Sequence, residues 1–368
     1  MDSRVTSSGS TPSSKTIAFR AAPSRPAPAP GRRLPTAWSA SAGVLAALFL
    51  CAALGSGAQE RRYTIAFANL TEEPGVSLEG TGFTGRDVRQ SLELAARRYP
   101  VDLVFYENQR DGAKALANAA DAIGRRVDLY IQYQREASVN VAVAEKLRNA
   151  GIPILAVNYP VPGAPLYTAD NRAAGRIAGE ALAGFAAGSW RGQPTVGILL
   201  GHLTDQANRL PERAQAVREA LTRLLPAIRI TALDTRGNPA QVSPLLAKFM
   251  STQPATKVLI AAMDDATALA AKSALEAAGR TADAAIVSQG CDRSVHGGMS
   301  DHKEIDPNNR GSILIGSVAF YLDRYGYDIL PLALRMLRGE PLPPRTATPH
   351  LLITAANVWR EYPPYDMQ

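Results

Sequence analysis

The chain has 368 residues, of which 46% are hydrophobic, and it carries a formal net charge of +7. This length allows two or three domains with large cores. Residues 1–58 hold six basic residues and one acidic residue, so most of the excess charge lies there. We therefore do not interpret the basic composition of the whole chain as evidence of nucleic-acid binding.

The N-terminal region has the pattern of an export signal. Residues 1–41 are rich in Ser, Pro, Ala and Arg, and Ala42–Leu54 is an apolar run that is too short to span a bilayer. Residues 56–58 are small, as a cleavage site requires, so we predict a signal peptide that is cut after Ala58 and a periplasmic protein. An uncleaved anchor and a later start codon stay open, as does the choice between Sec export and the twin-arginine route that Arg32-Arg33 suggests.

The cysteines and histidines do not form the patterns of a disulfide framework or a metal site. Cleavage after Ala58 would remove Cys51 and leave Cys291 as the only cysteine, which excludes an intrachain disulfide. Leu50 stands before Cys51 where a lipoprotein signal has a small residue, so lipidation is the less favoured interpretation. The four histidines show no metal-binding spacing, and the chain has no phosphate-loop pattern, so we predict no metal and no cofactor.

From Tyr63 onward, apolar strand patterns alternate with helical patterns. The first cycle predicts strands and helices in turn at 63–69, 86–99, 101–106, 113–123, 129–132, 139–147 and 152–157. After a short strand at 166–168 and a helix that begins near Arg172, the second cycle predicts strands at 195–200, 228–233, 258–263 and 285–287, with helices at 212–225, 242–250 and 266–278. A strand at 312–318, a helix at 325–338, a Pro-rich link at 341–344 and a strand at 350–354 follow. This order predicts an α/β protein with two similar doubly wound parallel-sheet lobes.

Polar side chains follow several predicted strands. Asn158 and Tyr159 end the strand within the stretch Gly151–Leu182, and ligands of parallel α/β sheets bind beyond such strand ends. Asp264 and Asp265 stand between a strand and a helix, where a carboxylate can accept hydrogen bonds from sugar hydroxyls. The alternatives are structural, because an Asn before a Pro-rich loop often only makes turn hydrogen bonds and an Asp there often only caps the helix.

Arg213 is a further candidate, since it stands at the start of a predicted helix. A cation there opposes the helix dipole, so we expect another reason for its presence, such as a ligand. A solvated surface arginine is the alternative interpretation.

Taken together, these segments resemble type I periplasmic sugar-binding proteins and the effector domains of lac-repressor-type regulators. Within Gly151–Leu182, an IPVI-type strand, a polar pair, a short loop and a D-N-x-x-A-G helix start carry the resemblance. In that alignment Asp265 falls on the family's ligand-binding Asp and Arg213 on its hydroxyl-donating Arg. The chain departs from the family pattern at Asp264, Ala270 and Ala216, and Asn158-Tyr159 replaces the Asp-Arg pair of ribose and galactose binders.

The resemblance implies a set of ligand-binding residues. Ser317 and the strand end Gln289–Asp292 match family positions, the long first loop offers polar groups, and the third strand's end could replace its missing aromatics. The predicted ligand-binding residues are Asn69, Thr71, Gln134, Asn158, Tyr159, Arg213, Asp265, Gln289, Asp292 and Ser317.

The resemblance also implies the domain organisation. Lobe one would comprise residues 62–168 plus 318–347, and lobe two residues 169–316 plus 348–360. Three crossovers near Tyr167–Asp170, Ile315–Ser317 and Ala347–His350 would join the lobes of a monomer, which closes on its ligand by a hinge motion.

The implied function is the capture of a sugar or related polyol for delivery to an ABC importer, without covalent chemistry. A periplasmic sensor that presents its ligand to a receptor kinase stays open. A transcription regulator is less favoured, because residues 1–60 hold an apolar run in place of a helix-turn-helix. A dinucleotide-dependent enzyme would need G-x-G-x-x-G after its first strand, where this chain has Asn69-Leu-Thr-Glu-Glu. The sequence does not name the ligand.

Overall fold

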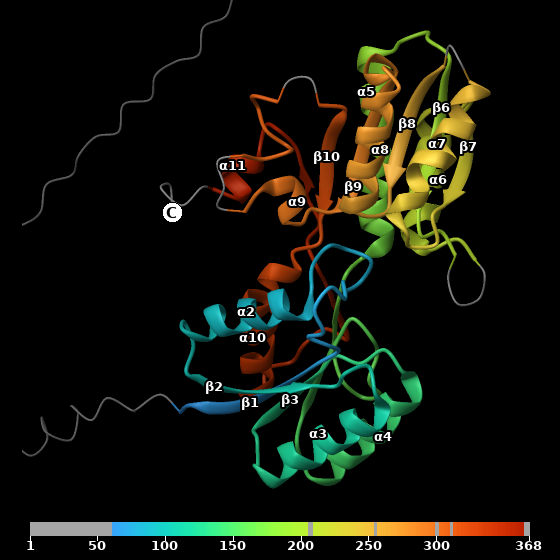
Figure 1. Ribbon diagram of the computed structural model, residues 1–368. Coiled ribbons are helices and arrows are strands. Elements are labelled where there is room, and N and C mark those ends of the chain that lie inside the picture. Colours follow the sequence, from blue (N-terminus) through green and yellow to red (C-terminus); the bar gives the residue numbers. More distant parts are fainter. Residues whose placement is uncertain (1–60, 205–208, 254–255, 299–301, 310–311, 364–368) are drawn as a thin grey trace, which may run out of the picture. The chain divides into compact units, whose positions relative to one another are not determined.

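The computed structural model describes residues 61–204, 209–253, 256–298, 302–309 and 312–363. Residues 60–368 form one compact unit, and the predicted leader, residues 1–58, lies outside the described residues. This unit contains two six-stranded sheets with helices on both faces (Figure 1). The predicted α/β class with two parallel-sheet lobes is confirmed.

The first sheet is entirely parallel, with the strand order β11-β5-β4-β3-β1-β2. Its strands are β1 (Tyr63–Asn69), β2 (Val101–Glu107), β3 (Leu129–Gln132), β4 (Ile154–Val157), β5 (Leu166–Thr168) and β11 (Arg345–Ala347). The accompanying helices are α2 (Gly85–Ala96), α3 (Gly112–Gly124), α4 (Ala137–Asn149) and α10 (Tyr325–Leu337).

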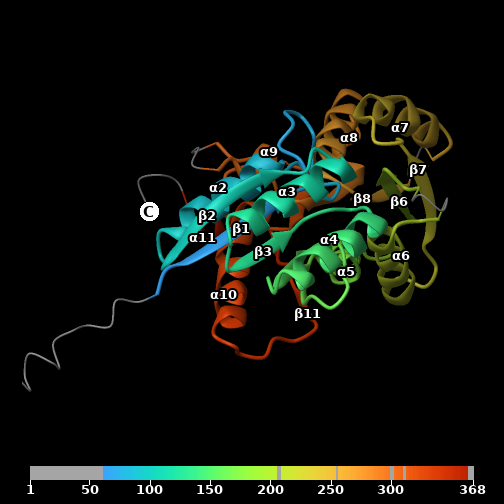
Figure 2. The same cartoon turned by 90° about the horizontal axis from the view of Figure 1, so that it is seen from below.

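Alternate residues of β1 separate the two helical layers of the first sheet. Ile65 and Phe67 belong to the core cluster that contains α2 and α10, whereas Ala66 and Ala68 belong to the cluster that contains α3 and α4. Figure 2 looks onto the face that α3 and α4 cover. Since both faces are covered, the strands consist of continuous apolar runs.

The second sheet has the order β12-β10-β9-β8-β6-β7, and only the β10–β12 pair is antiparallel. Its strands are β6 (Thr195–Gly201), β7 (Arg229–Asp234), β8 (Lys257–Ala262), β9 (Ala284–Gly290), β10 (Leu314–Ala319) and β12 (Leu352–Ile353). The helices are α5 (Asn171–Ser189), α6 (Glu212–Leu224), α7 (Val242–Ser251), α8 (Asp265–Ala277), α9 (Arg293–His296) and α11 (Val358–Glu361).

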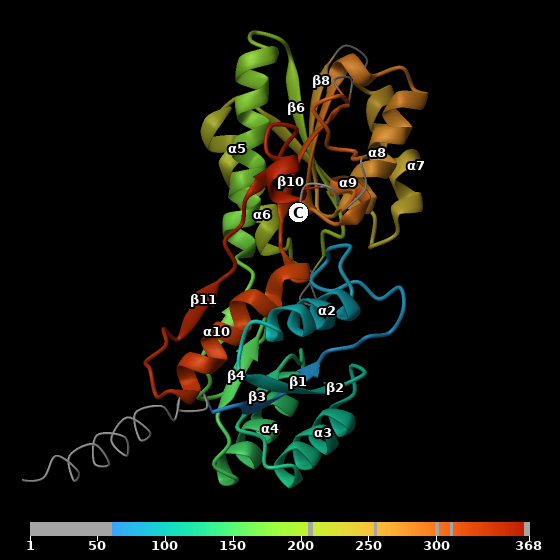
Figure 3. The ribbon, with the colours of Figure 1, turned by 90° about the vertical axis from the view of Figure 1, so that its left-hand side faces the viewer.

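The helices of the second sheet also form two layers. Leu199 of β6 packs in the cluster of α5 and α6, while Ile198 and Leu200 pack in the cluster of α7 and α8. Figure 3 shows α7 and α8 on the side of this sheet away from α5. Carboxylates fix two helix starts, because Asp170 accepts from the N–H of Ala173 at 2.9 Å and Asp264 from that of Thr267 at 2.7 Å.

Three features differ from the sequence expectations. β11 was not predicted, because it is three residues long and follows the Pro-rich link directly. Only Leu352–Ile353 of the strand expected at 350–354 forms a ladder. The crossover expected at Ile315–Ser317 lies inside β10, which stays paired in the second sheet as far as Ala319. The chain therefore leaves this sheet later than expected.

No helix in the described ranges is long and apolar enough to cross a membrane. The same ranges contain no group of three His, Cys, Asp or Glu side chains that could hold a metal ion.

Candidate functional site

Polar side chains gather at the carboxyl ends of the strands in both sheets. Asn69 ends β1, Gln134 follows β3 and Asn158 follows β4, while Gln289 and Ser317 lie in β9 and β10. All except Asn158 are buried. Because parallel strands bring these ends to one edge of a sheet, they lie where α/β proteins bind ligands.

Arg213 connects the two sheets. This second residue of α6 is 8% exposed, and all five of its N–H groups are donated within the protein. Nε and Nη2 both donate to Oδ1 of Asn171, and Nη1 donates to the carbonyl of Met263 at 3.1 Å. The other two N–H groups reach the loop after β1, at the carbonyls of Gly80 (3.2 Å) and Glu79 (2.7 Å). Burial lowers the pKa of Arg213 to about 10, which still leaves it charged at neutral pH.

Asp265 forms a buried centre within the second sheet. Its side chain is fully buried, and Oδ1 accepts hydrogen bonds from the hydroxyls of Ser288 (2.5 Å) and Ser317 (2.7 Å). Oδ2 accepts from the backbone N–H of Asp292 at 2.8 Å. Burial, followed by the charge of Asp292, raises the pKa of Asp265 to about 7. Asp265 therefore fixes Ser317 and Asp292, and its own oxygens have no exposed surface.

Asp292 and Gln289 complete the polar edge of the second sheet. Asp292 caps α9, since Oδ1 accepts from the N–H and the hydroxyl of Ser294 at 2.7 and 2.5 Å. Gln289 is fully buried, and its Oε1 has no hydrogen-bond partner among the described groups. An orphaned buried acceptor is costly, so this oxygen is a natural site for a donor from a bound molecule or water.

Asn158 has a structural role in the first sheet. It adopts a left-handed backbone with φ +57°, its Oδ1 accepts from the N–H of Ala169 at 3.1 Å, and its Nδ2 donates to the hydroxyl of Tyr133 at 3.1 Å. The turn interpretation of this residue thus accounts for most of its contacts. Tyr159 follows it, and its ring stacks on that of Tyr133 with centroids 6.2 Å apart.

The remaining candidates of the first sheet are also held by neighbouring groups. Asn69 donates to the carbonyl of Gly85 at 2.8 Å, and its Oδ1 is orphaned. Thr71 donates to Glu107. Gln134 accepts from the N–H of Arg135 at 2.7 Å, and its Nε2 has no partner in the part of the chain that the structure describes. That the ten predicted residues contact a ligand stays a prediction.

One segment that the sequence analysis did not single out lies among these groups. The β1–α2 hairpin, residues 77–84, is closed by an antiparallel bridge between Ser77 and Thr84. The N–H of Thr81 donates to the carbonyl of Leu78 at 2.9 Å across its tip. The available signal was the unusual length of the loop with its Glu79-Gly80 pair, which is weaker than the Asn-Gly of typical hairpin turns.

The model of the family described as the periplasmic binding protein domain matches residues 75–341. The chain belongs to this family. No curated protein matches it.

Several solved structures share the fold at low sequence identity. A Mycobacterium smegmatis protein in complex with β-D-fucofuranose has a TM-score of 0.59 and 21% identity over 83% of this chain and 95% of its own. A Bacillus halodurans ABC transporter solute-binding protein with bound myo-inositol has a TM-score of 0.58 and 19% identity over 82% and 97%. The fructose-binding periplasmic domain of a hybrid two-component system has a TM-score of 0.57 and 18% identity over 82% and 93%.

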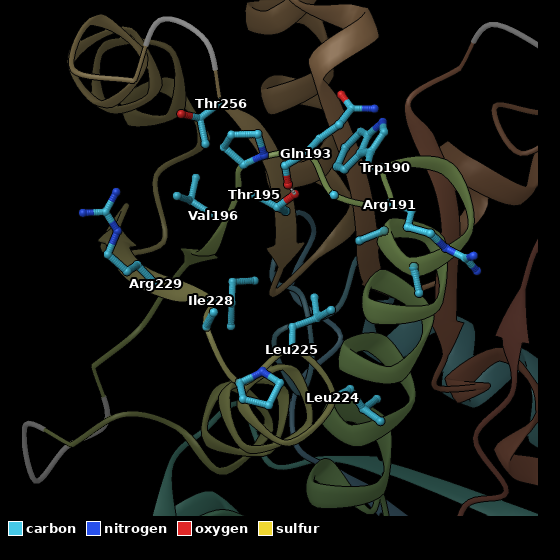
Figure 4. Close-up of a pocket in the computed structure, with 16 residues that line it drawn as sticks. Trp190, Arg191, Gln193, Thr195, Val196, Leu224, Leu225, Ile228, Arg229 and Thr256 are labelled. Atoms are coloured by element: carbon cyan, nitrogen blue, oxygen red, sulfur yellow. Dashed lines mark hydrogen bonds between the residues drawn. The ribbon is translucent and has the colours of Figure 1, made fainter.

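This periplasmic binding protein domain also has a pocket of about 660 Å³ at the amino ends of β6 and β7 (Figure 4). Apolar side chains, among them Trp190, Leu225 and Ile228, line much of it. The pocket lies at the strand ends opposite to those that carry Asp265 and Ser317. Because ligands of α/β proteins bind beyond the carboxyl ends of the strands, the candidate site is the polar edge that carries Asp265 and Ser317 and not this pocket.

Proposed function

We propose that the protein captures a sugar or related polyol between its two lobes in the periplasm and delivers it to an ABC importer. The observation that carries this proposal is the contact that Arg213 makes between the two sheets. Arg213 lies in α6 beside the second sheet, and it donates to the carbonyls of Glu79 and Gly80 in the loop that follows β1 of the first sheet. Such a pair of facing polar edges suits a ligand that is rich in hydroxyl groups.

The lobes of this proposal are residues 62–168 plus 318–347 and residues 169–316 plus 348–360, with the boundary near 317 moved to the end of β10, which stays in the second sheet as far as Ala319. Three chain passages between the sheets would act as the hinge, and binding would be a bending motion without covalent chemistry. Export by a signal peptide that ends at Ala58 is part of the same proposal. It is supported by the family to which the chain belongs.

A sensor function is the second candidate. One similar structure is the fructose-binding periplasmic domain of a hybrid two-component system, so this fold also occurs in the sugar-binding part of such a system. The two roles differ in their partner. Co-purification of a permease from membranes of the native host would favour import, whereas co-purification of a histidine kinase would favour sensing.

A thermal-shift screen of sugars and polyols tests the binding function itself. A ligand at 100 times its dissociation constant stabilises the folded protein by about 2.7 kcal/mol, which such a screen resolves. Calorimetry on the best ligand should give one site per chain. Absence of any stabilising sugar, polyol or sugar derivative across a broad panel would contradict the proposal.

A further inference from the structure

The β1–α2 hairpin projects its tip into the candidate site. Glu79 and Gly80 both have left-handed backbones, with φ of +54° and +62°. Two successive positive φ values, together with the hydrogen bond from Thr81 to Leu78, make a tight turn of the hairpin type. A glutamate at such a position is uncommon, because a side chain at positive φ is strained.

Backbone carbonyls of this tip accept hydrogen bonds from Arg213. Two of its five N–H groups go to the carbonyls of Glu79 and Gly80, and the other three go to Asn171 and Met263. No N–H group of Arg213 is left for a ligand hydroxyl while the hairpin stays in place. The two carbonyls thus stand where acceptor atoms of a ligand would stand.

The side chain of Glu79 at the tip accepts hydrogen bonds from donors of the first sheet in the same way. The carboxylate of Glu79 accepts from the hydroxyl of Tyr133 at 2.6 Å and from that of Tyr159 at 3.2 Å. Arg135 donates to the hydroxyl of Tyr159 at 3.0 Å. The charge of Glu79 offsets part of the lowering that burial causes in the pKa of Arg213. The carboxylate of Glu79 therefore accepts from the first sheet, while its backbone carbonyl accepts from Arg213 of α6.

The hairpin also fits closely against the second sheet's edge. A Cβ atom added to Gly82 would lie 1.5 Å from Oδ2 and 2.3 Å from Cγ of Asp292. The carboxylate of Asp292 cannot easily rotate away, because its Oδ1 caps α9 through Ser294. Only a glycine at position 82 permits this contact.

We infer that the β1–α2 hairpin is an internal occupant of the ligand site, and that the ligand which displaces it is a sugar acid. The inference rests on the proposed function and specifies its regulation and its substrate class. A ligand must replace what the tip supplies, namely two acceptor oxygens for Arg213 and a carboxylate for the hydroxyls of Tyr133 and Tyr159. A hydroxylated chain or ring that carries one carboxylate supplies both.

A neutral sugar satisfies only part of this arrangement. When Glu79 leaves with the hairpin, the hydroxyls of Tyr133 and Tyr159 lose their carboxylate acceptor, and two N–H groups of Arg213 lose the carbonyls that accept from them. A sugar acid restores both, and hydrogen bonds to a charged acceptor are about twice as strong as neutral ones. The site therefore favours the acid over the matching neutral sugar.

Gly82→Ala tests the occupancy, with Gly184→Ala in α5 as the matched control. The added methyl group of the first variant collides with Asp292, whereas the second meets nothing within 4 Å. We expect small-angle scattering without ligand to give a larger radius of gyration for Gly82→Ala than for wild type and Gly184→Ala. Glu79→Gly, which removes the carboxylate and the strained φ without a clash, should give the same increase if Gly82→Ala folds poorly. Equal radii for all four proteins would overturn the occupancy.

Calorimetry with matched ligand pairs tests the substrate class. D-galacturonate is compared with D-galactose, and D-gluconate with D-glucitol, on wild type, Gly82→Ala and Gly184→Ala. We expect the acid of the preferred pair to bind at least tenfold more tightly than its neutral partner. Gly82→Ala should bind that acid roughly tenfold more tightly than wild type, because the competent state no longer has to be opened first.

The outcomes separate this inference from the proposed function. Neutral sugars that bind as tightly as the acids would overturn the substrate class, and weaker binding by Gly82→Ala would overturn the occupancy by making the hairpin a part of the site. If the radii differ as expected but no sugar or acid of a broad panel binds any variant, the occupancy stands and sugar binding fails.

Discussion

Asp265 holds three groups of the second sheet's edge from a position without exposed surface. Burying a carboxylate is unfavourable, and three hydrogen bonds from Ser288, Ser317 and Asp292 offset part of that cost. The remaining cost appears as a pKa that is raised from 3.8 to about 7. The native protein thus keeps a proton on Asp265 that the unfolded chain releases.

This pKa predicts how stability depends on pH. Between about pH 4 and pH 7 the native state binds more protons at Asp265 than the unfolded state, so the contribution of Asp265 to the free energy of unfolding falls as the pH rises, by up to about 1.4 kcal/mol per pH unit. Asp265→Asn should lose this part of the slope and should also be less stable at every pH, because its amide nitrogen faces a donor. Urea unfolding at several pH values measures both effects.

The pH dependence of the unfolding free energy of Asp265→Asn tests this prediction. Burial also raises the pKa of Asp323, to about 6, but it lowers the pKa of His296, to about 3, and that of His350. These groups contribute slopes of opposite sign in both proteins, so the difference in slope between Asp265→Asn and the wild type isolates the contribution of Asp265. An unchanged slope in the variant would contradict the raised pKa of Asp265.

Arg213 gives a second prediction at the residue scale. Arg213→Ala leaves the buried carbonyl of Met263 and the carbonyls of the hairpin tip without donors, so we expect a loss of about 1–3 kcal/mol of unfolding free energy. Arg218→Ala, on an exposed position of the same helix, is the control and should change stability by no more than about 0.5 kcal/mol. Urea denaturation compares them. Equal, small effects would mean that the network around Arg213 is not formed.

Helices α5 and α6 approach each other closely enough to require glycine. A Cβ atom on Gly175 would lie 2.0 Å from the carbonyl oxygen of Arg213, and one on Gly179 would lie 2.7 Å from the Cβ of Ala220. The D-N-x-x-A-G start of α5 therefore has a packing reason at its glycine. It sets the distance to the helix that carries Arg213.

Substitution of these glycines should separate packing from helix propensity. Gly175→Ala forces α6 away or strains it, so we expect a loss of about 1–3 kcal/mol of unfolding free energy despite the better helix former. Gly184→Ala on the same helix has open space and should be neutral or more stable by up to about 1 kcal/mol. Chemical denaturation of both variants measures the difference. A stabilised Gly175→Ala would show that the two helices can move apart at no cost.

Most of the elements could be predicted from the sequence, because long apolar runs and helix caps are local signals. α5 begins at Asn171, next to its expected start near Arg172, with Asp170 as its N-cap, and the strands of both cycles appear near their expected places. β11 could not be predicted, since a three-residue strand exists only through its pairing with β5.

The candidate site could be predicted only in part. Its polar residues followed from strand ends and motifs, but their partners depend on contacts between distant segments. The hydrogen bond from Arg213 to Glu79 spans 134 positions of the chain, and no local pattern specifies such a contact. The same holds for Asp265, whose carboxylate is held by Ser288 on β9 and Ser317 on β10.

At the scale of the whole described unit, one histidine joins the three passages between the sheets. Nδ1 of His350 lies 2.8 Å from the carbonyl oxygen of Ala319 at the end of β10, and its Nε2 accepts from the N–H of Asp170 after β5 at 3.0 Å. His350 itself lies between β11 and β12. A neutral ring makes both bonds, with Nδ1 as the donor, and burial lowers its pKa in agreement with this. The three passages are thus coupled and would bend together.

A disulfide across the hairpin contact gives a test of that motion. An ideal Cβ atom on Gly82 lies 3.0 Å from the Cβ of Asp292, slightly less than the usual 3.5–4.5 Å between disulfide-linked Cβ atoms. The pair Gly82→Cys and Asp292→Cys, made with Cys291→Ala in the chain that starts at Gln59, should therefore form a disulfide with only a small shift. This bond would tie the first sheet's hairpin to the second sheet's edge and hold the site shut.

We expect the oxidised double variant to bind no ligand and to show no ligand-dependent change in scattering. Reduction should restore the motion, because the covalent link is then removed. The Gly82→Cys single variant in the same Cys291→Ala background is the control, and an oxidant should leave its binding unchanged. Mass spectrometry of the free thiols and calorimetry before and after reduction supply the measurements. Failure of the pair to oxidise would show that the hairpin does not rest against Asp292 in solution, and full binding by the oxidised protein would show that the site opens without moving the hairpin.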